Sequence, residues 1–175
     1  MNRLLAIIAI LSVVGFGCIT KSQDVPPESE AGGYENAQYG FSFSYPTNLE
    51  VREREEANRA TKYLGFDADF FISLRDTVRD VKPTNIAWFY AAPNMTVEKF
   101  TAALEASNSD GAVKVKSVED VTVNGFAMKK MTSSTEMGED KVHYLFDHNG
   151  TLIIVSVFIA EEETWGGVLQ TMDKM

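Results

Sequence analysis

The chain has 175 residues, 45% of them hydrophobic, and its formal net charge is -9 at pH 7. An acidic surface of this kind repels phosphate backbones and anionic lipid headgroups, so we expect no nucleic-acid partner and no membrane attachment through a basic patch. The length suits one domain, and because the chain has a single cysteine, that domain must be stabilised by a hydrophobic core rather than by an internal disulfide.

The N-terminal segment is typical of an export signal. Arg3 precedes an apolar stretch, Leu4 to Phe16, and Gly17 then leads into Cys18. A basic start, an apolar run and a small residue before the cut are the features that a signal peptidase recognises. We therefore predict that residues 1–17 are a cleaved signal peptide and that Cys18 is lipidated, which anchors an extracytoplasmic domain to the cell membrane.

Two other interpretations of this segment stay open. Residues 14–18 resemble the bacterial lipobox, but Gly15 stands where that motif usually has leucine. An uncleaved segment would be a membrane anchor, although the apolar run Leu4 to Ile19 is shorter than the roughly 20 residues that cross a bilayer. A cleaved but unlipidated chain would be a soluble secreted protein. All three interpretations place the rest of the chain outside the cytoplasm.

Residues 18–33 are predicted to form a lipidated, disordered tether. From residue 20 on, this segment has one large aliphatic side chain, Val25, and it contains the pair Pro26-Pro27, so it buries little apolar surface. A flexible segment of this length spans roughly 20 Å, enough to hold a domain just clear of the headgroups. The folded domain is then expected to span residues 34–175.

Alternating apolar and polar residues predict several strands. Phe41, Phe43 and Tyr45 alternate with serines, and the pattern stops at Pro46. This period of two indicates a strand with one buried face. Segments rich in aromatic and β-branched residues predict further strands at Leu49–Val51, Phe70–Leu74, Ile86–Ala91 and Val113–Val123.

A helix is expected from Thr96 to about Leu104. Thr96 suits the N-cap, and Glu98 lies in the first turn, where the helix dipole favours an acid. Val97, Phe100 and Leu104 recur at helical spacing, so one side of this helix is expected to cover a sheet.

A second helix is expected near the C-terminus, after the acidic run Glu161–Glu163. Gly166 and Gly167 would weaken this helix by about 1 kcal/mol per glycine relative to alanine, so it needs tertiary packing to form. Its apolar stripe consists of Trp165, Val168, Leu169 and Met172.

Two hairpins are indicated in the second half of the chain. Asn124-Gly125 is the strongest short-range signal for a hairpin turn. A second hairpin is expected from Val142–Phe146 and Leu152–Ile159, joined by residues 147–150. Leu152 to Val155 is apolar without alternation, which predicts a central strand covered on both faces. Two helices on a largely antiparallel sheet make an α+β fold.

The segment Tyr34-Glu35-Asn36, followed by the run Tyr39 to Pro46 with its GFSFSYP sequence, resembles the opening of PsbP-like domains. Further along, Thr96–Leu104 is similar to the central helix of that family, Val121–Phe126 to its hairpin and Leu152–Ile159 to its closing strand. The resemblance implies a PsbP-like sandwich, with a central and mainly antiparallel β-sheet flanked by helices. It also implies an extrinsic, mostly non-enzymatic protein, and bacterial relatives of this family include lipoproteins.

The best metal-ligand candidates are His143, Asp147 and His148, because imidazole and carboxylate suit zinc or manganese. A closed structural zinc site uses four ligands, so these three would need further partners. The alternative is a solvated hairpin tip with one strand histidine. Two carboxylate pairs suggest calcium only weakly, because neither lies in an EF-hand loop; they are Asp67 with Asp69, and Glu161 with Glu163.

Signals for catalysis are absent from the sequence. It has no G-x-S-x-G elbow and no phosphate-binding glycine-rich loop, and lipidation would consume its one thiol. Five aromatic residues are candidates for the lining of a ligand groove, but aromatics that alternate in a strand are more often core residues. They are Tyr39, Tyr45, Trp88, Phe89 and Tyr90.

We therefore expect a membrane-anchored, extracytoplasmic lipoprotein of the cell envelope with a PsbP-like domain. Its expected role is that of a non-enzymatic accessory or assembly factor that binds a membrane protein complex, without a cofactor. The alternatives are an envelope module that binds a small ligand or a divalent metal, and a hydrolase whose site has no recognisable motif.

Overall fold

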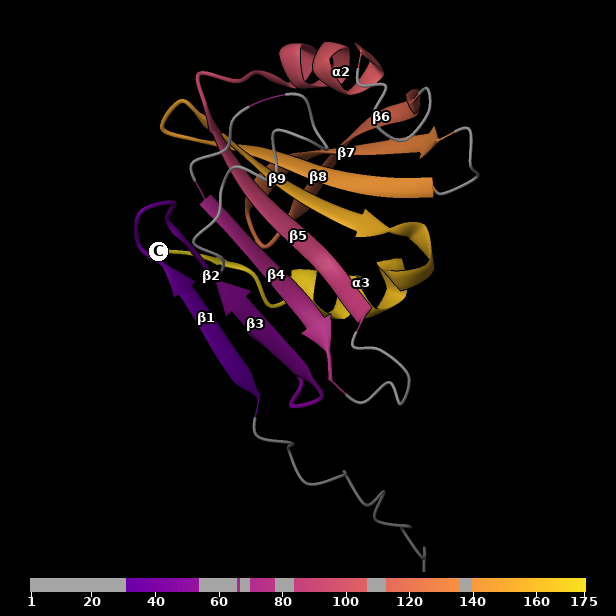
Figure 1. Ribbon diagram of the computed structural model, residues 1–175. Helices are drawn as coiled ribbons and strands as arrows, with labels where there is room; N and C mark the ends of the chain where they lie inside the picture. Colours follow the sequence, from indigo (N-terminus) through magenta and orange to yellow (C-terminus); the bar gives the residue numbers. More distant parts are fainter. Residues whose placement is uncertain (1–30, 54–65, 67–69, 78–83, 107–112, 136–139) are drawn as a thin grey trace, which may run out of the picture.

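The computed structural model describes residues 31–53, 66, 70–77, 84–106, 113–135 and 140–175 (Figure 1). The predicted signal peptide, Cys18, most of the predicted tether and the pair Asp67 and Asp69 lie outside these ranges. Within the described ranges, no helix is long and apolar enough to cross a membrane.

In the described part of the chain, seven strands form one large antiparallel sheet. The apolar strand β9 (Thr151–Phe158) lies at its centre, as the unbroken run Leu152 to Val155 predicts. Both predicted hairpins are present, and together they account for β9 and the three strands on one side of it. In spatial order the strands are β3 (Leu49–Glu53), β4 (Phe70–Asp76), β5 (Thr84–Pro93), β9 (Thr151–Phe158), β8 (Asp140–His148), β7 (Phe126–Thr135) and β6 (Val113–Val123).

A second, smaller sheet contains β1 (Gly32–Asn36), β2 (Phe41–Tyr45) and β10 (Asp173–Lys174), with β2 in the middle. The sequence patterns indicate β2 but neither of its neighbours. β1 begins at Gly32, two residues before the expected start of the folded domain at Tyr34. The reason is that its backbone pairing with β2 continues past Tyr34, from the Tyr34–Phe43 pair to the Gly32–Tyr45 pair.

Both predicted helices are present, on opposite faces of the large sheet (Figure 1). α2 (Val97–Ala106) begins after Thr96, whose hydroxyl accepts a hydrogen bond from the Lys99 amide as an N-cap does. A short 3-10 turn, η1 (Ile159–Glu161), leads into α3 (Glu162–Leu169). α3 ends earlier than predicted, so Met172 lies beyond the helix, but its side chain is still buried.

Two clusters of buried side chains fill the two faces of the large sheet. Between this sheet, the small sheet and α3, Phe41 and Phe43 stack on Phe89 with ring centroids 6.0 and 5.4 Å apart, and Trp165 meets Phe89 edge-on at 5.4 Å. The second cluster lies beneath α2 and includes Phe100, Leu104, Met131, Leu145, Leu152 and Ile154.

The aromatic residues expected in the core are there, with two of them half-buried. Tyr39, Phe89 and Tyr90 are buried, whereas Tyr45 and Trp88 keep part of their surface exposed. The arrangement confirms an α+β fold with a central antiparallel sheet flanked by helices.

Two tight turns set the register of the paired strands that follow α2. Asn124 and Gly125 both have positive φ, 44° and 79°, as a type I′ hairpin turn requires. Asn149 and Gly150, at 51° and 78°, form a second turn of this kind. This second turn is shorter than predicted, because β8 continues through His148 and pairs it with Thr151.

Candidate functional site

A groove lies between the start of α2 and the strands β6, β7 and β8. The start of α2 is held against the β8–β9 turn by a hydrogen bond of 3.0 Å from the Asn94 amide to the Gly150 carbonyl. Asn94 itself has a positive φ of 55°, which turns the chain from β5 into the helix. This contact fixes where the first turn of α2 stands over the sheet.

The sheet side of the groove is set by strand register. Asp120 on β6 pairs with Lys129 on β7, and Lys129 pairs with Leu145 on β8. Residues paired in this way point to the same face of the sheet, and Leu145 belongs to the cluster beneath α2. The three side chains therefore form one row under the groove. Asp147, two residues beyond Leu145, points to the same face and pairs with Leu152 on β9.

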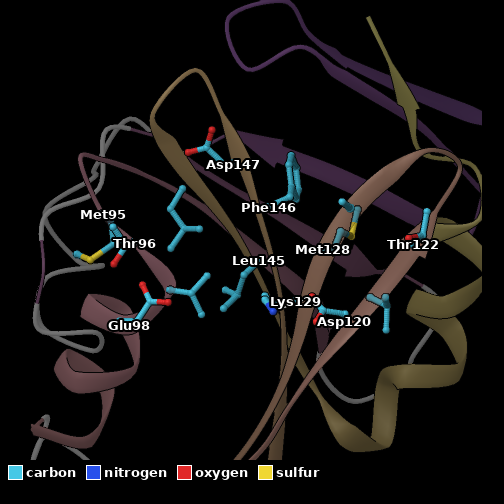
Figure 2. Close-up of a pocket in the computed structure, with 14 residues that line it drawn as sticks. Met95, Thr96, Glu98, Asp120, Thr122, Met128, Lys129, Leu145, Phe146 and Asp147 are labelled. Carbon is cyan, nitrogen blue, oxygen red and sulfur yellow. Dashed lines mark ion pairs between the residues drawn. The ribbon is translucent and has the colours of Figure 1, made fainter.

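The groove encloses about 580 Å³, within the range of small-molecule and peptide-side-chain sites. Leu145 and Leu152 are buried at its base, and Val97 from α2 is half-buried. Figure 2 shows Leu145 in the middle, with Glu98 on the α2 side, Asp120 on the β6 side and Asp147 at the end near the β8–β9 turn. An apolar base is thus surrounded by charged and exposed side chains.

Carboxylates dominate the charge of the groove. Its described lining residues include three acids, Glu98, Asp120 and Asp147, and one lysine, Lys129. The Lys129 ammonium lies 2.7 Å from Asp120 Oδ1; the Asp120 side chain is largely in water and that of Lys129 is partly exposed. The exposed ion pair therefore adds little to stability, but it cancels one of the three negative charges.

Glu98 and Asp147 both accept hydrogen bonds as carboxylates. A bond from the backbone amide of Glu98 and another from the Thr96 hydroxyl lower the pKa of Glu98, and the nearby Lys129 lowers it further. Asp147 Oδ1 accepts a bond of 3.3 Å from the Gly150 amide in the adjoining turn. Glu98 is therefore ionised at neutral pH, and Asp147 is held in place by the turn.

The predicted metal candidates are not brought together as one group. His143 lies beneath α2, where its ring meets Phe100 edge-on at 5.5 Å. His148 lies five residues further on, so it points to the other face of the sheet, where its ring rests beside Gly40. Asp147 lies at the groove. Among the described residues, no three His, Cys, Asp or Glu side chains are close enough to hold a metal ion together.

His143 forms a buried polar cluster with two serines. Its Nε2 lies 3.0 Å from Ser133 Oγ, and its Nδ1 lies 2.8 Å from Ser156 Oγ. The His143 side chain is 1% exposed, and both serines are buried as well. Burial lowers the pKa of His143 to about 3, and the nearby Lys141 also lowers it. A serine beside a neutral histidine suggests a nucleophile and its base, but a substrate has no access to this cluster.

Sequence reasoning singled out Asp147 at this site, and Thr96 and Glu98 only as helix-capping residues. It missed Asp120 and Lys129, although the Asn124-Gly125 turn carries the signal. A two-residue turn at this place pairs Val123 with Phe126, and counting back from that pair sets Asp120 opposite Lys129. The position of α2 above this row has no such local signal.

No protein-family model and no curated protein sequence matches this chain. Among solved structures, it is similar to the cyanobacterial PsbP (CyanoP) of Synechocystis sp. PCC 6803, with a TM-score of 0.56 and 11% identity over 96% of this chain and 99% of that one. LpqN of Mycobacterium tuberculosis, described as involved in cell envelope biogenesis, has a TM-score of 0.43 and 10% identity over 82% of this chain and 89% of its own. The resemblance that the GFSFSYP segment indicates is therefore confirmed for the fold: this chain contains a domain with the PsbP-like fold.

Proposed function

We propose that this protein is a lipid-anchored, extracytoplasmic accessory factor that binds a protein partner in a membrane complex and catalyses no reaction. The N-terminal export segment and Cys18 support the anchor. The fold supports the role, because a domain shared with cyanobacterial PsbP suits an extrinsic protein. The attachment then depends on the lipid, since the acidic chain has no electrostatic attraction to anionic headgroups.

The groove between α2 and the β6–β8 strands carries this proposal. Its charged side chains stand in water around an apolar base, an arrangement that favours recognition of a polypeptide segment over chemistry in an enclosed pocket. Its described lining residues include no serine, cysteine or histidine, so they form no Ser-His or Cys-His pair of nucleophile and base.

Large apolar side chains do not gather into an exposed patch on the described surface. Val118, Ile159 and Met175 are exposed, but they lie on β6, in η1 and at the C-terminus. A partner is therefore expected to be recognised by charge together with a small apolar base, and such interfaces form quickly and are sensitive to salt.

A small-ligand module is the second candidate, because the volume of the groove also suits a small molecule. The exposed rim argues for the polypeptide, since pockets for small molecules bury most of the ligand surface.

Intact mass of the membrane-extracted protein tests the anchor, and mild crosslinking in the same membranes tests the partner. We expect the mass of the chain from Cys18 plus lipid, its loss in a Cys18→Ser variant, and a crosslinked complex that needs the anchored form. An unprocessed or lipid-free mass would overturn the anchor. A chain that remains uncrosslinked in its native membrane would overturn the accessory role.

A further inference from the structure

We infer that the groove between α2 and β6–β8 is the docking surface for a basic segment of the partner, with the aliphatic stem of a lysine or arginine against Val97 and Met95, above the buried Leu145 and Leu152, and its cation between Glu98 and Asp147. This inference rests on the proposed function and specifies the chemistry of the partner.

Charge complementarity selects a basic occupant. Of the three acids among the described lining residues, Asp120 is paired with Lys129, which also lies near Glu98, and Glu98 and Asp147 face the groove from different elements. The first turn of α2 offsets part of the Glu98 charge, so Asp147 is the stronger attraction for a cation. The acidic chain as a whole adds long-range attraction for a basic partner.

The base of the groove selects a cation on an aliphatic stem. Val97 and Met95, both half-buried, present apolar surface at the groove, above the buried Leu145 and Leu152. Lysine and arginine lay their methylene stems along such surface while the charged head stays in water near an acid. Met95, half-buried beside the start of α2, is a flexible side chain that adapts to the shape of such a stem.

A divalent metal ion fits the same acids less well. A hard cation needs several oxygen ligands converging on one point, and no three acidic or histidine side chains among the described residues do so. Separate carboxylates around an apolar base instead suit separate contacts along one extended segment.

A peptide titration tests the inference on the mature lipidated chain in zwitterionic detergent at pH 7 and low salt. The probe is a Gly-Ser peptide with three lysines. One counterpart replaces lysine by norleucine, which keeps the stem without the charge, and another replaces it by diaminobutyrate, which keeps the charge on a shorter stem. The methyl NMR signals of Val97, Leu145 and Leu152 report occupancy. We expect the lysine peptide to shift these signals and to bind several-fold more tightly than either counterpart.

Matched charge variants locate the site. Glu98→Gln with Asp147→Asn keeps both hydrogen-bond acceptors and removes two charges from the groove. The control pair Glu119→Gln and Asp173→Asn removes the same charge from exposed positions on β6 and β10. Each exposed ion pair changes an affinity by about twofold to threefold. The groove variant should therefore bind the lysine peptide about fivefold more weakly than the unmodified chain, and the control should bind it within about twofold of the unmodified chain. Equal losses in both variants, equal binding of norleucine, or no shift in the three methyl signals would overturn the inference.

Crosslinking in native membranes separates this inference from the proposed function. If the groove variant keeps the crosslinked complex of the unmodified chain, the partner binds elsewhere, so the docking site is wrong and the accessory role stands. If the unmodified chain forms no complex, the accessory role fails, and the peptide titration still decides whether the groove binds basic segments.

Discussion

His143 and Ser156 are joined across β8 and β9 by a hydrogen bond of 2.8 Å between the ring Nδ1 and the serine Oγ, in the interior beneath α2. The other ring nitrogen meets Ser133. Both nitrogens of a neutral imidazole are thereby satisfied, one as donor and one as acceptor. A proton added to this ring would place a charge in the core, which explains why burial lowers the pKa of His143 to about 3.

This histidine makes the folded state sensitive to acid. Between pH 6.5 and about 3 the unfolded chain binds a proton at His143 that the folded chain does not, so the free energy of unfolding falls as the pH falls. The slope approaches about 1.4 kcal/mol per pH unit once the pH is below 6.5, so the free energy of unfolding falls by between about 1 and 2 kcal/mol from pH 6.5 to pH 5. Urea unfolding at these two pH values should show this loss. His143→Asn should remove it, whereas His148→Asn keeps His143 and should keep the slope; identical slopes in all three proteins would refute the prediction.

Trp165 should be among the side chains most sensitive to truncation. It is fully buried, and its ring centroid lies 5.4 Å from that of Phe89 and 6.4 Å from that of Phe43. Trp165→Ala should cost about 3–5 kcal/mol because it opens a cavity in the larger core cluster. Trp165→Phe should cost less, since the indole Nε1 is buried without a hydrogen-bond partner and nothing polar is lost with it. Urea unfolding by circular dichroism compares the two, and equal losses would contradict this account.

A side chain at Gly40 should destabilise the protein, for two separable reasons. Its φ is +64°, and a Cβ there would lie 2.4 Å from Cε1 of His148. Gly125 has a similar φ of +79° with no atom within 4 Å, so Gly125→Ala measures the backbone strain alone, about 1–2 kcal/mol.

Gly40→Ala is therefore expected to lower the thermal midpoint more than Gly125→Ala does. Adding His148→Ala to Gly40→Ala should recover part of the difference by removing the clash. A Gly40→Ala variant no worse than Gly125→Ala would show that the His148 ring does not lie against this residue.

Gly167→Ala should stabilise the protein. Gly167 lies within α3, is exposed, has ordinary helical backbone angles and has no atom within 4 Å of the position of an added Cβ. Alanine is favoured over glycine in a helix by about 0.5–1 kcal/mol because glycine loses more backbone entropy on folding. The midpoint of urea unfolding should rise accordingly, and a fall would mean that α3 needs the glycine.

Local patterns in the sequence predict the elements whose formation depends on their own residues. Phe41 and Phe43 alternate with serines because one face of β2 is buried, and Asn124-Gly125 determines the pairing of β6 with β7. By contrast, β10 is two polar residues, Asp173 and Lys174, with no apolar pattern. It pairs with β2 because the burial of Met172 brings the chain end alongside that strand.

Local sequence patterns do not predict the groove, for a related reason. The wall formed by the start of α2 is held by the hydrogen bond between Asn94 and Gly150, which are far apart in the sequence. His143 shows the same limit: Val142 to Phe146 are buried on both faces of β8, so no alternation marks which side chain is polar and enclosed. The resemblance to PsbP-like domains predicted the fold but carried no information about these residues.

Crosslinking in native membranes tests most directly whether the groove binds a protein partner. The yield of the crosslinked complex is compared between three proteins: the unmodified chain, the Glu98→Gln and Asp147→Asn groove variant, and the Glu119→Gln and Asp173→Asn control. We expect one specific complex for the unmodified chain and the control, a clear loss in the groove variant, and a lysine- or arginine-containing partner peptide attached at the groove. An uncrosslinked chain in all three membranes, or a complex that is equally strong in the groove variant, would contradict this expectation.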